Sequence, residues 1–275
     1  MSDALGLRDL NLNLYEPHKE IITYQRWFGR YARSYLSDAS SQDKVAMGLK
    51  LVHSQRVRKL AKDLALCLNL AERQVFLSEL CGLFHDIGRL PQFKKYKTFF
   101  DAKSEDHAAL GVEVLERHGV FSDLGQEEKT HVLDAIFVHN KFSIPKAFQG
   151  QRLILSKILR DADKIDIWRV FDDYYRKGSV TKDVNLGLPP GRTISGAVLE
   201  DLESDKIVRI EHVQNQLDFI IMRLSWLFDI NFKHSLGIIA KRNYIHTMFQ
   251  MLPEGKEKEI VRRKITALLE ERLGR

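Results

Sequence analysis

Cysteine and proline are scarce in this chain, which has 2 cysteines and 6 prolines among 275 residues. Two cysteines cannot form the disulfide framework of a small secreted protein. Cys67 and Cys81 both fall in apolar helical stretches, so we expect small buried side chains in a reducing compartment. The N-terminal residues also lack a basic segment followed by an apolar run, the pattern of a secretory signal. The expected location is therefore cytoplasmic.

Long hydrophobic runs are missing as well. The most apolar late stretch, residues 217–232, is interrupted by Asp218, Arg223 and Asp229. Charges at this spacing favour a buried helix over a membrane span, so we expect no membrane partner. The formal net charge is +6. It favours anionic ligands such as phosphates and nucleotides, although ordinary solubility explains it at least as well.

Alternating β-strand patterns are absent, and the chain shows helical periodicity instead. The aromatic and lysine-rich segment 89–103 is interpreted as a loop between a helix that ends at Gly88 and one capped by Ser104. The sequence therefore predicts an all-α fold in four parts: an N-terminal helical segment (1–42), a main helical domain (43–177), a linker rich in glycine and proline (178–192) and a C-terminal helical region (193–275) that packs on the main domain.

The most informative residues are an adjacent pair, His85 and Asp86, which follow the apolar run 80–84. A histidine and a carboxylate are costly to bury in apolar surroundings unless something binds them. A divalent metal is the natural candidate, because imidazole and carboxylate together suit first-row transition metals. The pair therefore predicts a metal centre.

Four more metal-competent residues lie on the apolar stripes of their own helices. His53, for example, shares a helix face with Val57 and Leu60, because residues at these spacings lie on one side of a helix. A single inward histidine is usually a satisfied core residue, but a whole set on several helices is hard to explain separately, and helical bundles do build metal centres in this way. The predicted ligands are His53, His85, Asp86, His107, His139 and Asp163. The other histidines lack this pattern and are interpreted as surface or structural residues: His18, His118, His131, His212, His234 and His246.

With this pattern the chain resembles the HD-domain superfamily of metal-dependent phosphohydrolases. The resemblance covers about residues 44–175, where the family's motifs occur in order. It implies an all-α helical bundle around a metal centre of the binuclear type. The matching pieces are His53-Ser-Gln-Arg-Val57, Leu83-Phe-His-Asp-Ile-Gly88, Asp106-His-Ala-Ala-Leu-Gly111, Ile136-Phe-Val-His139 and Arg160-Asp-Ala-Asp-Lys-Ile-Asp166.

The resemblance also implies which residues hold a first metal. Asp163, rather than Asp161, fits the family's Ala-Asp-Lys order. The adjacent Lys164 matches a lysine that contacts substrate phosphate in some nucleotide-hydrolysing members. The implied ligands of this first metal are His53, His85, Asp86 and Asp163.

His107 and His139 match positions that hold a second metal in binuclear members, with Asp86 as the bridging carboxylate. In mononuclear members, a histidine at the His107 position assists catalysis instead. Two such metals would clamp a phosphoryl group and activate a water molecule. The implied catalytic residues are Asp86, His107 and Lys164.

Cations near the motifs are the candidates for substrate binding, because positive groups offset the charge that develops on a transferring phosphoryl group. Arg56 lies one turn from His53, and Arg89 stands where the family's usual lysine follows His-Asp-Ile-Gly. The arginine keeps the charge but changes its geometry. The candidates are Arg56, Arg89 and Lys164, with Lys94, Lys95 and Lys97 of the following loop as further candidates.

The sequence thus predicts a metal-dependent phosphohydrolase that cleaves a phosphate ester or anhydride in a small substrate, with a nucleotide as the preferred interpretation. A histidine-rich site favours Mn²⁺, Fe²⁺, Co²⁺ or Ni²⁺, about one or two per chain, over Mg²⁺ alone, which prefers oxygen ligands, and Mg²⁺ stays open as a further cofactor.

Two alternatives stay open. A mixed-valence di-iron oxygenase of the same superfamily uses the same ligands, and the basic charge also allows a metal-stabilised signalling or nucleic-acid-binding module. A complete ligand set with open coordination positions favours an enzyme over such a module. Nucleic acid is therefore not the expected partner, and a homodimer stays open.

Overall fold

The computed structural model describes residues 19–176 and 186–274, and every regular element within these ranges is a helix. This confirms the predicted all-α fold. The α-helices are α1 (Lys19–Leu36), α2 (Ser41–Cys67), α3 (Glu72–Phe84), α4 (Arg89–Tyr96), α5 (His107–Arg117), α6 (Gln126–Val138), α7 (Gly150–Arg176), α8 (Gly196–Glu203), α9 (Gln216–Ser225), α10 (Lys233–Lys241), α11 (Tyr244–Gln250) and α12 (Lys256–Leu273). Short 3₁₀ helices are η1 (Asp101–Lys103), η2 (Ile210–His212) and η3 (Trp226–Asp229).

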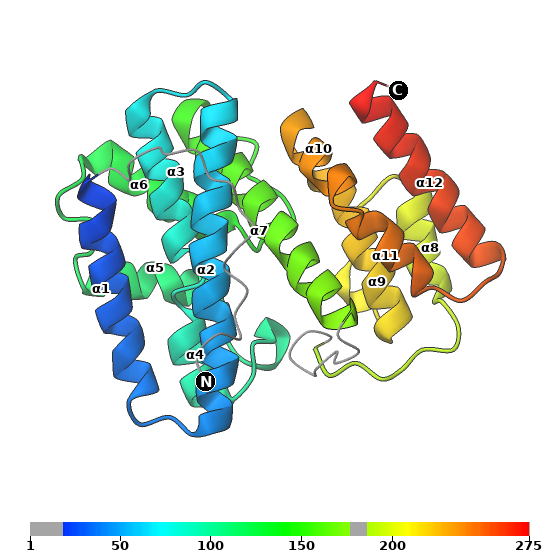
Figure 1. Cartoon of the computed structure of the whole chain (residues 1–275), viewed down its shortest axis with the longest axis horizontal. Helices are drawn as coiled ribbons and strands as arrows, with labels where there is room; N and C mark the ends of the chain where they lie inside the picture. The colour runs from blue at the N-terminus through cyan, green and yellow to red at the C-terminus, as the bar shows by residue number, and fades with distance from the viewer. Residues whose placement is uncertain (1–18, 177–185, 275) are drawn as a thin grey trace.

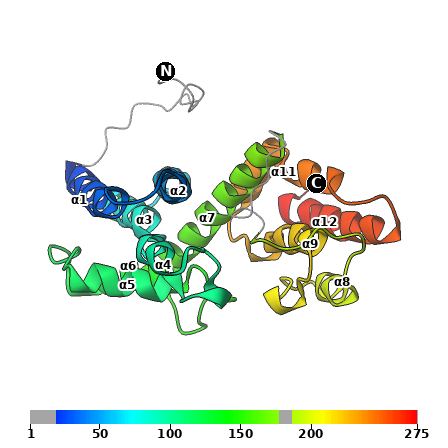
Figure 2. The same cartoon turned by 90° about the horizontal axis from the view of Figure 1, so that it is seen from below.

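The long helix α7 runs between two groups of helices (Figure 1). Helices α1 to α6 lie on one side of it and α8 to α12 on the other, and the view turned by 90° shows the same division (Figure 2). In the first group, α2 packs against both α3 and α7, and α6 packs against α7. Helix α7 is therefore the element that both groups share.

Two buried apolar clusters follow this division. Leu155 and Leu159 of α7 belong to the cluster built by the N-terminal helices, whereas Ile165, Trp168 and Phe171 belong to the cluster of the C-terminal helices. Because α7 supplies side chains to both clusters, the C-terminal helical region packs on α7 through a core of its own. The exact division of the chain into four segments stays a prediction, and part of the proposed linker (178–185) lies outside the described residues.

A glycine permits the close crossing of α2 and α3. A Cβ atom at Gly82 would lie 2.7 Å from the Cα of Arg58 and 2.9 Å from the carbonyl oxygen of Val57. These are backbone atoms that cannot give way as a flexible side chain would. The same crossing buries an ion pair between Arg58 and Glu79, with 2.5 Å between nitrogen and oxygen.

The prediction of one loop over residues 89–103 was wrong. This segment forms α4 and η1. Both helices are too short for an apolar repeat to show in the sequence, and so short a helix depends on tertiary packing. Gly88 does not end a helix in the left-handed conformation: its φ is −66°, α3 ends at Phe84, and residues 85–88 form a turn. Asp106, not Ser104, caps α5, since its side chain accepts hydrogen bonds from the backbone N–H groups of Ala108 and Ala109.

The expectation that both cysteines are buried is confirmed for only one of them. Cys81 is buried as expected, but Cys67 is exposed at the end of α2, with its Sγ 3.2 Å from Nε2 of His234. No described helix has both the length and the apolarity required to cross a bilayer.

Candidate metal centre

The structure brings all six predicted ligands into one cluster at the centre of the N-terminal helices. Five of them are buried, and the side chain of Asp163 is 15% exposed. The cluster contains three overlapping groups whose potential ligand atoms lie within 4.8 Å of one another: His53, His85 and Asp86; His85, His139 and Asp163; and Asp86, His107 and His139. This overlap makes one continuous centre rather than separate polar sites.

Helix ends supply half of these side chains. His85 follows the last residue of α3, His107 is the first residue of α5, and His139 follows the last residue of α6. His53 and Asp163 come from the interiors of α2 and α7, which pack against each other. The helix ends therefore converge on a seam between the two longest helices.

The first half of the cluster contains His53, His85, Asp86 and Asp163. The Nε2 atoms of His53 and His85 are 3.1 Å apart, and each lies 3.7 Å from Oδ2 of Asp86. Oδ1 of Asp163 is 3.0 Å from Nε2 of His53 and 3.5 Å from Nε2 of His85. Two imidazole nitrogens and two carboxylates thus face one point.

The second half uses the other oxygen of Asp86. Its Oδ1 lies 3.3 Å from Nε2 of His107, and that nitrogen is 3.0 Å from Nε2 of His139. The two oxygens of one carboxylate therefore face the two halves of the cluster. This is the arrangement expected of a residue that could serve two cations at once.

The four imidazoles are held so that their Nε2 lone pairs point inward. Nδ1 of His85 lies 2.9 Å from the carbonyl oxygen of Gly82, and Nδ1 of His139 lies 2.6 Å from that of Ile136. A carbonyl oxygen only accepts, so both Nδ1 atoms donate. When these rings are neutral, their Nε2 atoms carry unshared lone pairs.

Carboxylates hold the other two imidazoles in the same way. Nδ1 of His53 donates to Asp166 over 2.7 Å, and Nδ1 of His107 donates to Asp101 over 2.6 Å. Such outer partners commonly orient metal-binding histidines and raise their basicity. Converging lone pairs 3.0–3.1 Å apart repel unless a proton or a metal cation lies between them. The donor set therefore fits one or two divalent transition metals, although it does not identify the element.

For Asp86 and His139, the electrostatics favour the protonation state that binds a metal. Burial raises the pKa of Asp86, but the charges of Lys50, His85 and Arg89 outweigh burial and hold this pKa well below its usual range. Burial itself, together with the charges of His107 and His85, lowers the pKa of His139 well below the usual histidine value. Asp86 is therefore a carboxylate and His139 a neutral imidazole at neutral pH.

Two of the predicted substrate-binding cations are paired with carboxylates of the centre. Arg56 donates through Nε and Nη2 to both oxygens of Asp166, over 2.6 and 2.9 Å. Arg89 donates to Asp86 over 3.2 Å and to Asp101 over 2.7 Å. In this structure both guanidinium groups thus hold carboxylates that touch the histidines.

Lys164 is buried, and its ammonium group lies 2.7 Å from Oδ2 of Asp229 in η3. The lysines of α4 and the turn after it point elsewhere. Lys94 lies over the ring of Tyr35, and Lys95 and Lys97 pair with Glu105 and Asp43.

Sequence reasoning missed Lys50, Asp101, Asn140 and Asp166. Lys50 lies three residues before His53 and places its ammonium group 3.0 Å from Oδ2 of Asp86. Asp166 lies three residues after Asp163 on α7, so helical spacing could have found both of these residues. Nothing in the local sequence marks Asp101, which reaches His107 from η1, or Asn140, whose amide donates to Asp101 over 3.2 Å.

The remaining described histidines lie outside the cluster. They contact aromatic rings, polar side chains or Cys67, and His18 lies outside the described residues. Their partners are Trp27 and Tyr31 for His118, Gln151 for His131, Asp201 for His212, Cys67 for His234 and Gln250 for His246.

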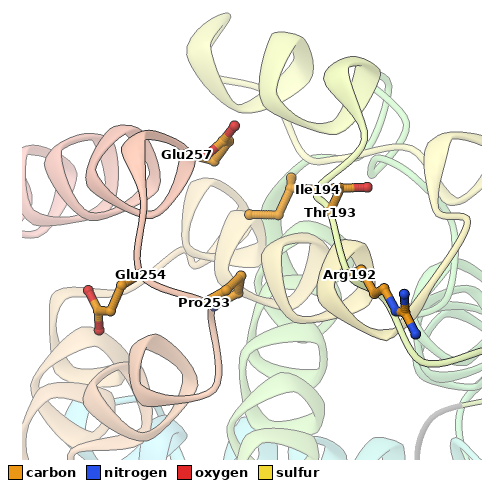
Figure 3. Close-up of a pocket in the computed structure, with 6 residues that line it drawn as sticks. All are labelled: Arg192, Thr193, Ile194, Pro253, Glu254 and Glu257. Atoms are coloured by element: carbon orange, nitrogen blue, oxygen red, sulfur yellow. The ribbon is translucent and has the colours of Figure 1, made fainter.

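A surface pocket in the C-terminal helical region is separate from this centre. Figure 3 shows its walls, which come from residues 192–194 before α8 and from Pro253, Glu254 and Glu257 around the start of α12. It contains no histidine and shares no residue with the cluster.

Comparison with known families agrees with this geometry. The family model of the HD domain matches residues 51–168, a range that contains all six clustered residues. HD domains bind divalent metals, and most of their superfamily are metal-dependent phosphohydrolases. No curated protein and no solved structure matches the chain. Residues 51–168 of this chain are therefore an HD domain.

Proposed function

We propose that this protein is a metal-dependent phosphohydrolase that cleaves a phosphate ester or anhydride in a small substrate, with a nucleotide as the proposed substrate class. The observation that carries this proposal is the position of Asp86, whose two oxygens face the two halves of the cluster. A site of this kind suits two cations. Such cations would assist phosphoryl transfer, because they stabilise the charge on the transferring group.

When bound, a divalent metal would act as a Lewis acid and lower the pKa of a coordinated water molecule. The protein's own part is to present the lone pairs. His53 and His85 would serve the first half with Asp163, and His107 and His139 the second. Asp166 and Asp101 keep Nδ1 of His53 and of His107 protonated, so that only Nε2 faces inward.

Substrate access is proposed on the side where the centre is least covered. The side chains of Lys50 and Asp163 are 25% and 15% exposed, whereas the side chain of His85 is fully buried. An anionic substrate that approaches from this side meets the ammonium group of Lys50 at the edge of Asp86. We therefore propose Lys50 as a phosphate-binding residue, together with Lys164.

The two arginines are proposed to act at closer range. Arg89 touches Asp86 and could also reach an oxygen of the substrate. Arg56 binds both oxygens of Asp166, so its proposed role is to hold the carboxylate that orients His53. A lysine at either position would lose the planar, two-pronged geometry of the guanidinium group.

The test is hydrolysis by metal-stripped protein that is reloaded with Mn²⁺, Co²⁺, Ni²⁺ or Mg²⁺. The substrates are p-nitrophenyl phosphate, bis(p-nitrophenyl) phosphate and a panel of nucleoside mono-, di- and triphosphates. We expect turnover that disappears on stripping, returns on reloading and is lost in Asp86→Asn. The matched control is Asp205→Asn, which removes a surface pair with Lys264 and should retain full activity. Absence of phosphate release with every metal would overturn the proposal.

A further inference from the structure

A carboxylate from the C-terminal helical region pairs with Lys164, the residue that follows the ligand candidate Asp163. Oδ2 of Asp229, in η3, lies 2.7 Å from Nζ of Lys164 and 2.6 Å from Nη2 of Arg160. Lys164 directly follows Asp163 on α7, whereas Asp229 is 65 positions later in the chain than Lys164. The contact therefore joins the C-terminal region to the helix that carries a metal-ligand candidate.

Arg160 extends this contact to the backbone around His139. Its Nη1 donates to the carbonyl oxygens of Val138, His139 and Lys141, over 3.0, 3.2 and 2.6 Å. These carbonyls belong to the last residue of α6 and to the turn after it, where orphan C=O groups need donors. Arg160 thus fixes the backbone of His139 while Asp229 fixes Arg160.

The turn that carries Asp229 is itself anchored. Arg272 of α12 donates to the carbonyl oxygens of Leu227 and Ile230, over 3.0 and 2.5 Å. Asp161 of α7 accepts from the backbone N–H groups of Asn231 and Phe232. The position of the Asp229 carboxylate is therefore set from both α12 and α7.

The charges explain why Asp229 matters to Lys164. The side chains of Arg160, Lys164 and Asp229 are 2%, 10% and 17% exposed, so water screens them poorly. Two cations share one carboxylate, and without it they would face each other in a buried site. Lys164 would then have to leave its position, because unpaired buried charges are strongly unfavourable.

We propose that Asp229 is a positioning residue of the active site: it fixes Lys164 beside Asp163 for phosphate binding, so that the C-terminal helical region completes the site of the HD domain. This inference rests on the proposed phosphohydrolase function. It gives that region a part in substrate recognition that packing alone would not require.

The experiment is a double-mutant cycle in the full-length, metal-loaded protein. Affinity for inorganic phosphate is measured by titration calorimetry for wild type, Asp229→Asn, Lys164→Ala and the double variant. We expect Asp229→Asn to weaken phosphate binding about tenfold, and to change it less than about twofold when Lys164 is already alanine. Hydrolysis should show the loss chiefly in KM.

The matched control is Thr247→Val. It removes another contact between the C-terminal region and α7, the hydrogen bond from Thr247 of α11 to Asp172, but touches neither Lys164 nor Arg160. If the C-terminal contact only supports folding, both variants lower the melting temperature and neither changes phosphate affinity. If Asp229→Asn is too unstable to titrate, Asp229→Glu is used, which keeps the charge but displaces it by one methylene and should weaken binding only when Lys164 is present.

Three results would overturn the inference. Equal loss in both Lys164 backgrounds would show that Asp229 acts without Lys164, and tighter phosphate binding in Asp229→Asn would show that Asp229 competes with phosphate. If the wild type binds phosphate and Asp229→Asn binds it equally well, the role given to Asp229 is overturned, whereas the proposed phosphohydrolase function is not. If the wild type neither binds phosphate nor hydrolyses any phosphate ester, the proposed function fails first and the inference fails with it.

Discussion

At the scale of single residues, the centre depends on groups that present one atom inward and bind a partner with another. Each imidazole donates from Nδ1 to an oxygen and directs Nε2 to the cluster. Asp86 differs, because both of its carboxylate oxygens face the cluster. Its removal should therefore affect both halves of the centre, whereas loss of an outer partner should affect one imidazole.

Asp86→Asn and Asp166→Asn should differ in degree for this reason. Asp86→Asn removes the charge that faces both halves, so we expect loss of metal binding and a fall in turnover of at least about 100-fold. Asp166→Asn keeps every inward atom but weakens the orientation of His53, so metal affinity should fall about 10–100-fold. Metal titration of the stripped proteins measures both effects. Equal effects of the two substitutions would contradict the separation of ligand and outer partner.

Stability of the metal-free protein should depend on pH through His53. Burial lowers the pKa of His53, but hydrogen bonds with Asp163 and Asp166 outweigh burial and raise it to about 9. Because this folded-state pKa exceeds the unfolded value of about 6.5, the charged ring stabilises the fold fully below that value. The contribution is lost as the pH rises towards 9. Metal binding displaces this proton, so metal affinity should rise over the same range.

Denaturant unfolding of the metal-free protein at several pH values between 6 and 9.5 tests this expectation. The wild type should lose stability as the pH rises, and His53→Gln should lose less over the same range. Identical pH dependence in the two proteins would show that His53 is not protonated in the metal-free fold.

The six clustered residues could be predicted because polar, metal-competent side chains on apolar helix faces are unusual and show in the sequence. Lys50 and Asp166 carry a weaker form of the same signal, since each lies three positions from a predicted ligand. Asp101 and Asp229 carry none. Asp101 lies in η1 and Asp229 in η3, and only the tertiary packing decides that their carboxylates meet His107 and Lys164.

At the scale of elements, a glycine sets the distance between the His85–Asp86 turn and α5. A Cβ atom at Gly88 would lie 2.2 Å from the carbonyl oxygen of His107 and 2.5 Å from the backbone nitrogen of Gly111. The close approach brings the start of α5, and therefore His107, up to Asp86. The sequence predicts Gly88 as the end of a helix. A glycine needed for close backbone contact cannot be distinguished, from the sequence alone, from one needed for a left-handed turn.

Gly88→Ala should therefore damage both the fold and the second half of the centre. We expect a loss of about 1–3 kcal/mol in unfolding free energy from overpacking, with weaker metal binding as α5 moves away. Gly48→Ala is the matched control: a Cβ there meets nothing within 4 Å, and α2 should gain about 0.5–1 kcal/mol. Denaturant unfolding compares the two. A neutral Gly88→Ala would contradict the role given to this contact.

At the scale of the whole molecule, α7 joins the HD domain to the C-terminal helical region. Ile165, Trp168 and Phe171 are buried against the C-terminal helices, on the same helix whose Asp163 faces the metal centre. The all-α class follows from helical periodicity. The surface that the C-terminal region packs on does not, because periodicity marks an apolar helix face without identifying its partner. The particular contact between η3 and Lys164 does not follow either, because it joins segments far apart in the chain.

A fragment that ends at residue 185 should expose this apolar face of α7. We expect it to aggregate or to bind a hydrophobic dye, because a large exposed apolar patch is poorly tolerated in a monomer. Co-expression of residues 186–275 as a separate chain should restore a soluble complex. A stable, monomeric fragment without its partner would show instead that the C-terminal region is an independent domain.

The most direct test of the central claim is the metal content of protein purified without chelator and without oxygen, measured by elemental analysis for wild type and Asp86→Ala. We expect about two divalent transition-metal ions per wild-type chain and close to none in the variant. Wild-type protein without metal above background would contradict the metal centre. Two iron atoms per chain with oxygen consumption, and without phosphate release, would contradict the proposed hydrolysis.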